Sequence, residues 1–380
     1  MMIAHRVRLV PTEAQEMQMR QACGVARFAY NWALAQWRDQ YKAGGKPSEG
    51  SLRKQLNGIK AEQFPWMADV TKNAPQQGIK NLGRAYTNFF SDLKKYKRKE
   101  IPWKRVRVPK FKKKGQHDGF RADPGPDAKR TQAVNVVAKS VDLPRIGWVE
   151  MREEVRFAGK ILSCTVSRQG DAWFASFCID APYEVDQHCA NDVIGVDLGV
   201  SSLGTLSDGT KIPAPKPLGR YLKKLRRLSR ALSRKKRGSC NRAKAKTKLA
   251  NLHRRIADIR ADALHKLTTY LTRFKTIVIE DLNVAGMVSN RCLARVISDV
   301  GFAEFRRQLE YKAKMAGATV IVANRWFASS KLCSDCGVKD ETLILSERTW
   351  TCLSCGTPHD RDHNAAINLA RYPDSCAGSA

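Results

Sequence analysis

Four cysteines near the C-terminal end of the sequence have the spacing of a tetrahedral metal site. Cys333 and Cys336 form one C-x2-C pair, and Cys352 and Cys355 form a second pair after fifteen intervening residues. Four thiolates fill the shell of Zn²⁺ at about 2.3 Å each and leave no position open for water or substrate. The pattern therefore predicts one zinc ion with a structural role. Two histidines follow the quartet, and we interpret them as polar surface or active-site neighbours: His359 and His363.

Three acidic residues stand where carboxylates can meet at one edge of a sheet. Asp197 and Glu280 each end an apolar, β-branched run that is typical of a buried strand, and Asp362 precedes a short helix expected at 364–370. Carboxylates are the hard oxygen ligands that Mg²⁺ prefers. Two such ions about 3.5 to 4 Å apart can activate water and stabilise a leaving oxygen. Each acid alone would fit a cap or a turn, but together they have the arrangement that a divalent-metal phosphodiesterase needs.

The elements that must position these residues follow from periodicity. A strand is expected at 5–10, and Thr12 with Gln15 has the spacing of a capping box that opens a helical region. This region reaches residue 100, with breaks at 42–47 and 64–66. From 131 to 180 the period changes to two, with a hairpin turn at 168–171. The sequence thus predicts a small β-barrel that a helical lobe interrupts.

The charge of the chain points to a polyanionic partner. Lys and Arg number 68 against 36 acidic residues, which gives a net charge of +32. Self-repulsion on this scale opposes compaction unless a polyanion balances it, and nucleic acid is the expected partner. One basic block, residues 94–114, is interpreted as a strand or loop that grips a nucleic-acid backbone, with a solvated linker as the alternative. A second block, residues 216–260, is expected to form two helices that turn at 237–239.

Eight residues are candidates for contact with nucleic acid. The polar group at 72–77 suits base edges, although a plain polar helix face explains it equally well, and the others belong to the two basic blocks. The candidates are Lys72, Gln76, Gln77, Lys110, Lys112, Arg226, Arg230 and Lys235.

The remaining composition favours a cytoplasmic protein. No apolar run approaches the length of a membrane span, and no secretion signal opens the sequence. The scatter of the other cysteines argues against a disulfide framework, and we interpret them as small buried or incidental thiols. They are Cys23, Cys164, Cys178, Cys189, Cys240, Cys292 and Cys376.

Several segments resemble one known family. They are RLVPTEAQ, VARFAYNWAL, VPKFKKKG, IGVDLGVSSLGTLSDG, IVIEDLNVAGM, RWFASSKLCSDCG and HDRDHNAAIN. Together they resemble the TnpB family of transposon-encoded, RNA-guided DNA endonucleases, which is ancestral-like to the type V CRISPR effectors. The resemblance covers nearly the whole chain.

The resemblance implies a RuvC-like, RNase H-fold nuclease whose catalytic, Mg²⁺-binding acids are Asp197, Glu280 and Asp362. Asp360 competes for the third position, and we prefer Asp362 because it directly precedes the His-Asn-Ala-Ala motif. The family also implies a guide RNA from the transposon end and a double-stranded DNA target beside a short motif. We expect one protein on one RNA in a prokaryotic, nucleoid-associated setting.

These inferences give a multidomain α+β protein. A wedge-like β-barrel is expected at 1–10 plus 106–190, a helical recognition lobe at 11–105, a RuvC-like nuclease at 191–330 plus 357–380, and a zinc knuckle at 331–356. Three alternatives remain at this stage: a guide-dependent DNA-binding repressor, an unguided structure-selective RuvC-type nuclease, and a compact type V CRISPR effector.

Overall fold

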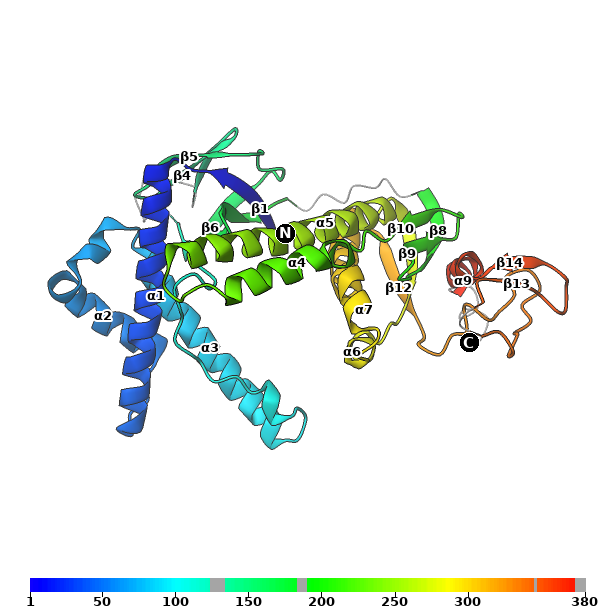
Figure 1. Ribbon diagram of the computed structural model, residues 1–380, viewed down its shortest axis with the longest axis horizontal. Helices are drawn as coiled ribbons and strands as arrows, with labels where there is room; N and C mark the ends of the chain where they lie inside the picture. The colour runs from blue at the N-terminus through cyan, green and yellow to red at the C-terminus, as the bar shows by residue number, and fades with distance from the viewer. Residues whose placement is uncertain (124–133, 183–189, 345–346, 373–380) are drawn as a thin grey trace. The chain divides into compact units, whose positions relative to one another are not determined.

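The computed structural model describes residues 1–123, 134–182, 190–344 and 347–372. The chain divides into two compact units, Met1–Pro182 and Tyr183–Ala380 (Figure 1). Two of the cysteines considered above, Cys189 and Cys376, lie outside the described residues, as does the C-terminal end from residue 373. No helix within the described ranges combines the length and the apolar character that crossing a membrane requires.

The first unit carries the helical region that periodicity predicts. Its helices are α1 (Glu13–Lys42), α2 (Glu49–Gln63) and α3 (Asn73–Lys97), with short 3-10 turns η1 (Pro65–Asp69) and η2 (Trp103–Arg105). The capping box is confirmed, because the Gln15 amide donates to the Thr12 hydroxyl and the Thr12 amide donates to the Gln15 side chain. Helix α3 extends to Lys97, into the first basic block. The expectation of a strand or loop is therefore wrong for residues 94–97.

The predicted β-barrel takes the form of an open sheet. Its strands are β1 (Met2–Val10), β2 (Gly119–Arg121), β3 (Asn135–Val137), β4 (Ser140–Leu143), β5 (Gly147–Met151), β6 (Lys160–Gln169) and β7 (Ala172–Asp180). They form an antiparallel sheet in the order β2-β6-β7-β1-β5-β4-β3, and no pairing joins β2 to β3 within the described residues. Closure of a barrel would require that pairing. The hairpin between β6 and β7 is confirmed.

The second unit is built on a mixed sheet. Its strands are β8 (Ala190–Asp197), β9 (Ser202–Leu206), β10 (Lys211–Pro213), β11 (Phe274–Glu280) and β12 (Thr319–Ala323). The order is β10-β9-β8-β11-β12. Strands β8, β9 and β10 pair antiparallel, whereas β11 is parallel to both β8 and β12. A separate small hairpin consists of β13 (Thr349–Thr351) and β14 (Pro358–Asp360).

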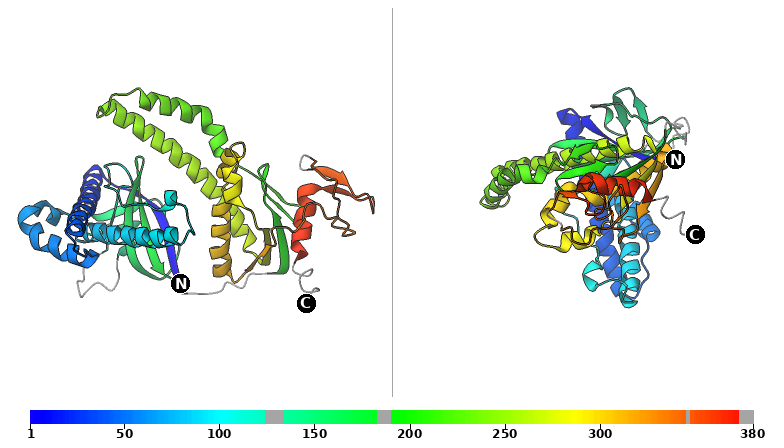
Figure 2. Two further views of the ribbon diagram at one scale, coloured as in Figure 1. Left: turned by 90° about the horizontal axis from the view of Figure 1, so that it is seen from below. Right: turned by 90° about the vertical axis from the view of Figure 1, so that its right-hand side faces the viewer.

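Helices cover both faces of the mixed sheet. They are α4 (Pro217–Ser233), α5 (Cys240–Leu271), α6 (Val284–Ser289), α7 (Ala294–Val300), α8 (Phe302–Ala316) and α9 (Arg361–Ala370) (Figure 2). On β11, Ile277 and Ile279 pack with α5 and α8, whereas Val278 packs with Leu369 of α9. Because successive side chains of a strand point to opposite faces, α9 lies on the face opposite to α5 and α8.

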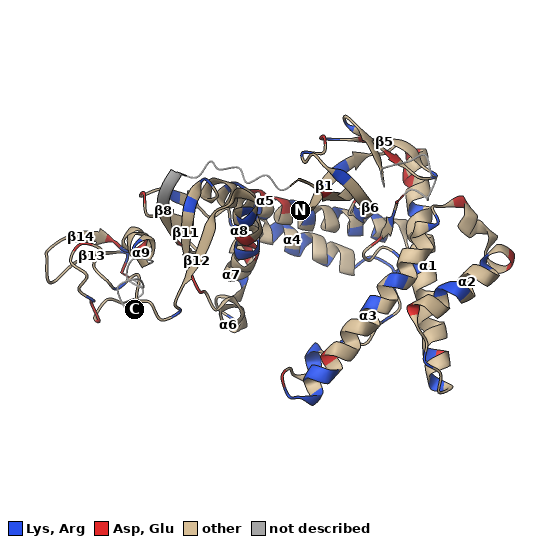
Figure 3. Ribbon diagram, turned by 180° about the vertical axis from the view of Figure 1, so that it is seen from behind, with Lys and Arg blue, Asp and Glu red and all other residues tan. Residues whose placement is uncertain are grey.

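The second basic block forms the two helices expected of it. Helices α4 and α5 pack against each other, and the turn between them contains Gly238 at a φ of +85°. Leu252 and Ile256 of α5 are buried along the expected apolar stripe. Figure 3 shows Lys and Arg along this pair of helices and at the C-terminal end of α3. The cations therefore occupy the exposed faces of helices whose apolar stripes are in contact.

Candidate metal centres

The two strand-end acids lie side by side. Ile279 pairs with Val196 in the parallel ladder of β11 and β8, so the next residues in register are Glu280 and Asp197. Strand alternation places both acids on the face that α9 covers, because Val196 and Ile279 point to the opposite face. The carboxyl ends of two parallel strands thus present two carboxylates to one helix.

Helix α9 brings the third acid to the same place. A Cβ atom added to Gly195 would lie 1.9 Å from the Ala366 carbonyl oxygen and 2.5 Å from the Ala370 amide nitrogen, so α9 rests directly on β8. Asp362 occupies the first turn of this helix, and its Oδ1 accepts from Nη1 of Arg348 at 3.2 Å. A glycine in the strand therefore sets the distance between Asp362 and the sheet.

The three carboxylates repel one another. Burial, followed by the negative charges of Glu280 and Asp362, raises the pKa of Asp197 to about 8. Arg361 and Arg348 oppose this rise without cancelling it. A divalent cation would supply the missing positive charge and favour ionised Asp197. The donor set, three carboxylates with excess negative charge, has the ligand chemistry that Mg²⁺ prefers, although the three groups are not drawn together as tightly as the four cysteine sulfur atoms are.

Asp360 has a different environment from Asp362. It is the N-cap of α9, where its Oδ1 accepts from the His363 amide at 3.0 Å, and its Oδ2 pairs with Nζ of Lys211 at 2.6 Å. Although partial burial opposes the change, the ion pair and the amide hydrogen bond lower the pKa of Asp360. The negative charge of Asp360 is thus already balanced by a cap and a cation, whereas the charge of Asp362 acts on Asp197.

The cysteine quartet is assembled for a metal. The four sulfur atoms lie within 4.8 Å of one another, and within the described residues this is the one such group of three or more His, Cys, Asp or Glu ligands. The Sγ atoms of Cys333 and Cys355 are 3.6 Å apart, as are those of Cys336 and Cys352. A tetrahedron with bonds of about 2.3 Å has edges of about 3.8 Å. These separations fit zinc.

Backbone hydrogen bonds around the quartet are also consistent with a four-cysteine metal site. After each C-x2-C pair a glycine has a positive φ, +75° at Gly337 and +76° at Gly356, and its amide donates to the carbonyl of the first cysteine of the pair. The neighbouring Thr357 side chain and then its amide lower the pKa of Cys355 to about 6. Although a hydrogen bond with the Val338 backbone opposes the change, desolvation and hydrogen bonds with the other three cysteines raise the pKa of Cys336 to about 12. Without a metal the quartet therefore keeps protons that a bound metal would displace.

The two histidines beside the quartet have distinct places. His359 is 8% exposed, its Nε2 lies 3.0 Å from Sγ of Cys333, and its ring packs against Trp350. It is therefore a buried neighbour of the cysteine quartet, so the surface interpretation is wrong for this residue. His363 lies on α9 with Nε2 3.3 Å from the Ser207 carbonyl oxygen. The pairing of β13 with β14, which places His359 opposite Trp350, could not be predicted from the position of His359 after the cysteines.

Sequence reasoning missed three polar residues between the two centres. Ser329 donates from its hydroxyl to Oε1 of Glu280 at 2.6 Å. Asn364 and Asn368 on α9 bond to backbone groups of residues 329–334, beside the first cysteines. All three are buried. The spacing of the two asparagines, one helical turn apart, was the signal that could have indicated their shared role.

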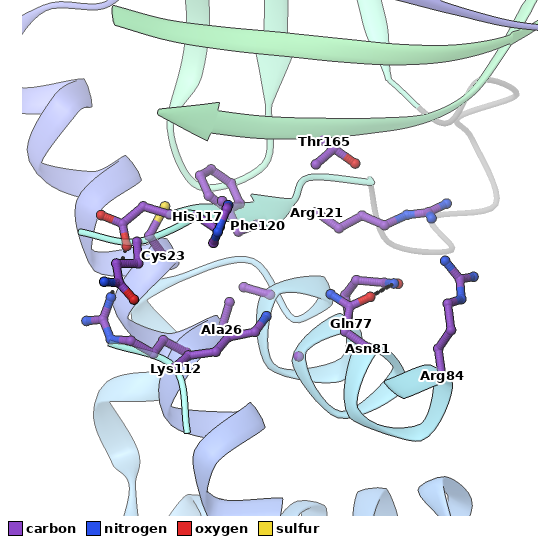
Figure 4. A pocket seen from close by; sticks show the side chains of 16 residues that line it. Cys23, Ala26, Gln77, Asn81, Arg84, Lys112, His117, Phe120, Arg121 and Thr165 are labelled. Carbon is purple, nitrogen blue, oxygen red and sulfur yellow. Dashed lines mark hydrogen bonds and ion pairs between the residues drawn. The ribbon is translucent and has the colours of Figure 1, made fainter. Parts of the chain in front are cut away.

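The eight candidate nucleic-acid contacts are dispersed. In the first unit, Gln77 and Lys112 line the same cleft, a cavity of about 270 Å³ between α3 and the segment before β2. Figure 4 shows both with Asn81, Arg84, His117 and Arg121 around it. Burial lowers the pKa of Lys112, whose Nζ lies 4.4 Å from the centre of the Tyr30 ring. Gln76 lines a separate cleft beside α2. The others are exposed: Lys72, Lys110, Arg226, Arg230 and Lys235.

Family models match most of the chain. Residues 176–291 match a family described as "Probable transposase", residues 1–46 match its "Helix-turn-helix domain", and residues 302–369 match "Cas12f1-like, TNB domain". The last of these ranges includes the cysteine quartet and Asp362.

Curated relatives match over nearly their full length. A "Putative RNA-guided DNA endonuclease" of Streptomyces pristinaespiralis is 36% identical over 96% of this chain and 88% of its own. The "Putative RNA-guided DNA endonuclease InsQ" of Escherichia coli K12 is 34% identical over 96% of this chain and 91% of its own. The chain therefore belongs to the OrfB/TnpB transposase family, as the sequence segments indicate.

A solved structure has a similar fold. A chain of the "Cas12f1-sgRNA-target DNA complex", determined by electron cryo-microscopy, aligns with a TM-score of 0.55 at 16% identity. The alignment covers 94% of this chain and 83% of that chain. This likeness supports the mixed α/β architecture.

Proposed function

We propose that this protein is an RNA-guided DNA endonuclease that hydrolyses DNA phosphodiester bonds, and that its catalytic carboxylates are Asp197, Glu280 and Asp362. The observation that carries the proposal is the convergence of these three carboxylates from β8, β11 and α9. The sheet order β10-β9-β8-β11-β12, with β11 parallel to β8 and β12, supports the proposal that the second unit is an RNase H-like, RuvC-type nuclease domain. Family membership and the names of the curated relatives support the same activity.

The three acids would hold two Mg²⁺ ions. Such ions, when bound, lower the pKa of water and stabilise the charge of the leaving oxygen. The chain itself supplies the negative cluster, which recruits the cations, and the helix contact at Gly195, which sets the position of Asp362. The zinc site is proposed to be structural, because four cysteines complete its shell.

The first unit and the basic helices are proposed to bind nucleic acid. A guide RNA from the transposon end would pair with one strand of double-stranded DNA, so that base pairing supplies sequence choice and the protein supplies charge. The exposed cations of α4 and α5 suit an RNA or heteroduplex backbone. The cleft with Gln77 and Lys112 offers amide and ammonium donors suited to base edges beside the target.

The domain assignment follows from this function. We assign residues 1–10 plus 106–190 to a wedge domain, 11–105 to a recognition lobe, 191–330 plus 357–380 to the nuclease and 331–356 to the zinc knuckle. The wedge would use an open sheet in place of a barrel. One protein on one RNA is the proposed assembly.

Replacement of Asp197 tests the proposal. The protein purified with its RNA should cut a plasmid that carries the guide-matched sequence, and Asp197→Ala should reduce the rate by about a thousandfold or more, since several kcal/mol of transition-state stabilisation are lost. Guide-dependent binding should persist in gel-shift assays. Asp262→Ala is the matched control, because Asp262 is an exposed carboxylate of α5 that forms an ion pair with Lys266 of the same helix at 2.7 Å.

Three outcomes would contradict the proposal in different ways. Binding without cleavage by the unmodified protein would indicate a guide-dependent repressor. Cutting of branched DNA after complete RNA removal would indicate an unguided nuclease. Unchanged cleavage by Asp197→Ala would refute the site. Sequencing the RNA that co-purifies separates a transposon-end guide from one transcribed from a repeat array.

A further inference from the structure

The hydroxyl of Ser329 holds one of the three acids. Ser329 lies in the segment between β12 and the cysteine quartet, is 3% exposed, and donates to Oε1 of Glu280 at 2.6 Å. Its own amide donates to the Phe327 carbonyl oxygen at 2.9 Å. A hydroxyl has a single hydrogen to donate, and a bond to a carboxylate is short and strong. Glu280 Oε1 is thereby held in one direction, with Oε2 left for another partner.

Two asparagines attach this segment to the helix that carries Asp362. Asn368 donates from Nδ2 to the carbonyl oxygens of Ser329 and Leu332, each at 2.8 Å. Asn364 donates to the Leu332 carbonyl oxygen at 2.7 Å, and its Oδ1 accepts from the Ser334 amide at 2.9 Å. The two side chains are 1% and 7% exposed for Asn364 and Asn368 respectively, so water does not compete for these bonds.

The contacts form a continuous buried connection between two metal-ligand carriers. It begins at Glu280 on β11, passes through the side chain and carbonyl of Ser329, and ends at Asn368 on α9. The three carboxylates repel one another, so their positions depend on packing and hydrogen bonds that oppose separation. Only one of these bonds, that of Ser329, reaches a carboxylate of the cluster directly from the segment preceding the quartet.

We propose that Ser329 and Asn368 are positioning residues of the nuclease centre, which hold Glu280 and the Asp362 helix in the geometry that binds the divalent metal. The proposal rests on the nuclease function proposed above. It assigns no contact with substrate to either residue. A purely structural role would instead confine their effect to the folding of residues 324–334.

The first test separates the hydroxyl from the bulk of the side chain. Ser329→Ala should weaken binding of Mn²⁺, used as the metal probe and followed by electron paramagnetic resonance on the RNA-bound protein, by about 10- to 100-fold. The Mg²⁺ concentration for half-maximal cleavage should rise by a similar factor. Ser329→Thr keeps the hydroxyl and should restore both values to within about threefold. Ser289→Ala is the control, because that exposed hydroxyl donates only to its own helix, at the Gly286 carbonyl.

The second test asks whether the two residues act as one unit. Asn368→Ala should also weaken Mn²⁺ binding, and the double variant should lose less than the product of the two single losses, because the second change breaks a connection already broken. Thermal unfolding and zinc content should stay close to those of the unmodified protein in Ser329→Ala.

Each outcome has a defined meaning. Unchanged Mn²⁺ affinity in both single variants would overturn the proposal, as would a Thr variant as weak as the Ala variant or strictly multiplicative losses in the double variant. If the unmodified protein binds Mn²⁺ but cuts no DNA, the nuclease function fails while the positioning role is still decided by the Mn²⁺ measurements.

Discussion

Replacement of Gly195 by alanine tests how closely α9 must approach the sheet. The added Cβ would stand 1.9 Å from the Ala366 carbonyl oxygen, whereas ordinary contacts begin at 3.4 Å. The atom it meets is helix backbone, which cannot rotate away as a side chain would. Helix α9 must therefore retreat by about 1.5 Å to restore ordinary contact, or β8 must distort.

The expected loss of activity follows from that displacement. Asp362 lies one turn before Ala366 on the same helix, so it moves with the contact. A misplacement of about 1 Å in a catalytic arrangement can cost about 100-fold in rate. We expect Gly195→Ala to lose about 100-fold or more in single-turnover plasmid cleavage, and to lose about 1 to 3 kcal/mol of stability through overpacking.

The control is a second buried glycine of the same sheet. A Cβ at Gly204 on β9 would meet its nearest atom, Cγ1 of Val196, at 3.5 Å, which is ordinary contact. Gly204→Ala should therefore cleave at nearly the unmodified rate, and both variants should retain RNA and zinc. If Gly195→Ala folds and cleaves like Gly204→Ala, the close approach of α9 does not determine the position of Asp362.

Two further predictions concern charge and metal. In metal-free protein Asp197 keeps its proton to a pKa of about 8, against 3.8 for the ordinary group, so the folded state binds more protons between these values. The free energy of unfolding should therefore fall as pH rises from about 4 to 8. Thermal unfolding of protein without divalent ions should show this fall, and Asp197→Asn should remove the part that Asp197 causes. Cys352→Ser should abolish zinc in elemental analysis and impair cleavage more than guide RNA binding, since structural zinc contributes roughly 10 kcal/mol to local folding. Unchanged cleavage by zinc-free protein would contradict the scaffold role.

Local patterns predicted the elements that carry the acids. Asp197 and Glu280 end strands as expected, because a β-branched apolar run bounded by polar residues is a short-range signal. The helix after Asp362 was also expected, although it begins at Arg361 with Asp360 as its cap. The clustering of the four cysteines was also predicted, because two C-x2-C pairs have the spacing that is typical of a zinc site.

Long-range pairing was beyond the same reasoning. Whether β2 and β3 close a barrel depends on the register of short strands distant in sequence, and the described residues form an open sheet. The burial of His359 depends on its pairing opposite Trp350 in the β13–β14 hairpin. Ser329 lies in the segment RWFASSKLCSDCG, which resembles the family. Its hydrogen bond to Glu280 joins residues 49 positions apart, and local sequence patterns cannot predict a contact at that distance.

The place of the proposed zinc knuckle in the chain explains why a structural metal would affect the proposed nuclease centre. Asp197 and Glu280 lie on neighbouring strands and are held by their ladder, whereas Asp362 follows a long segment that leaves β12 at Ala323. Ordering such a segment costs conformational entropy, and a metal cross-link within it reduces the freedom that must be lost. The bonds of Asn364 then join the ordered knuckle to α9. Loss of zinc should consequently displace Asp362 first and leave the strand-borne acids nearest their original positions.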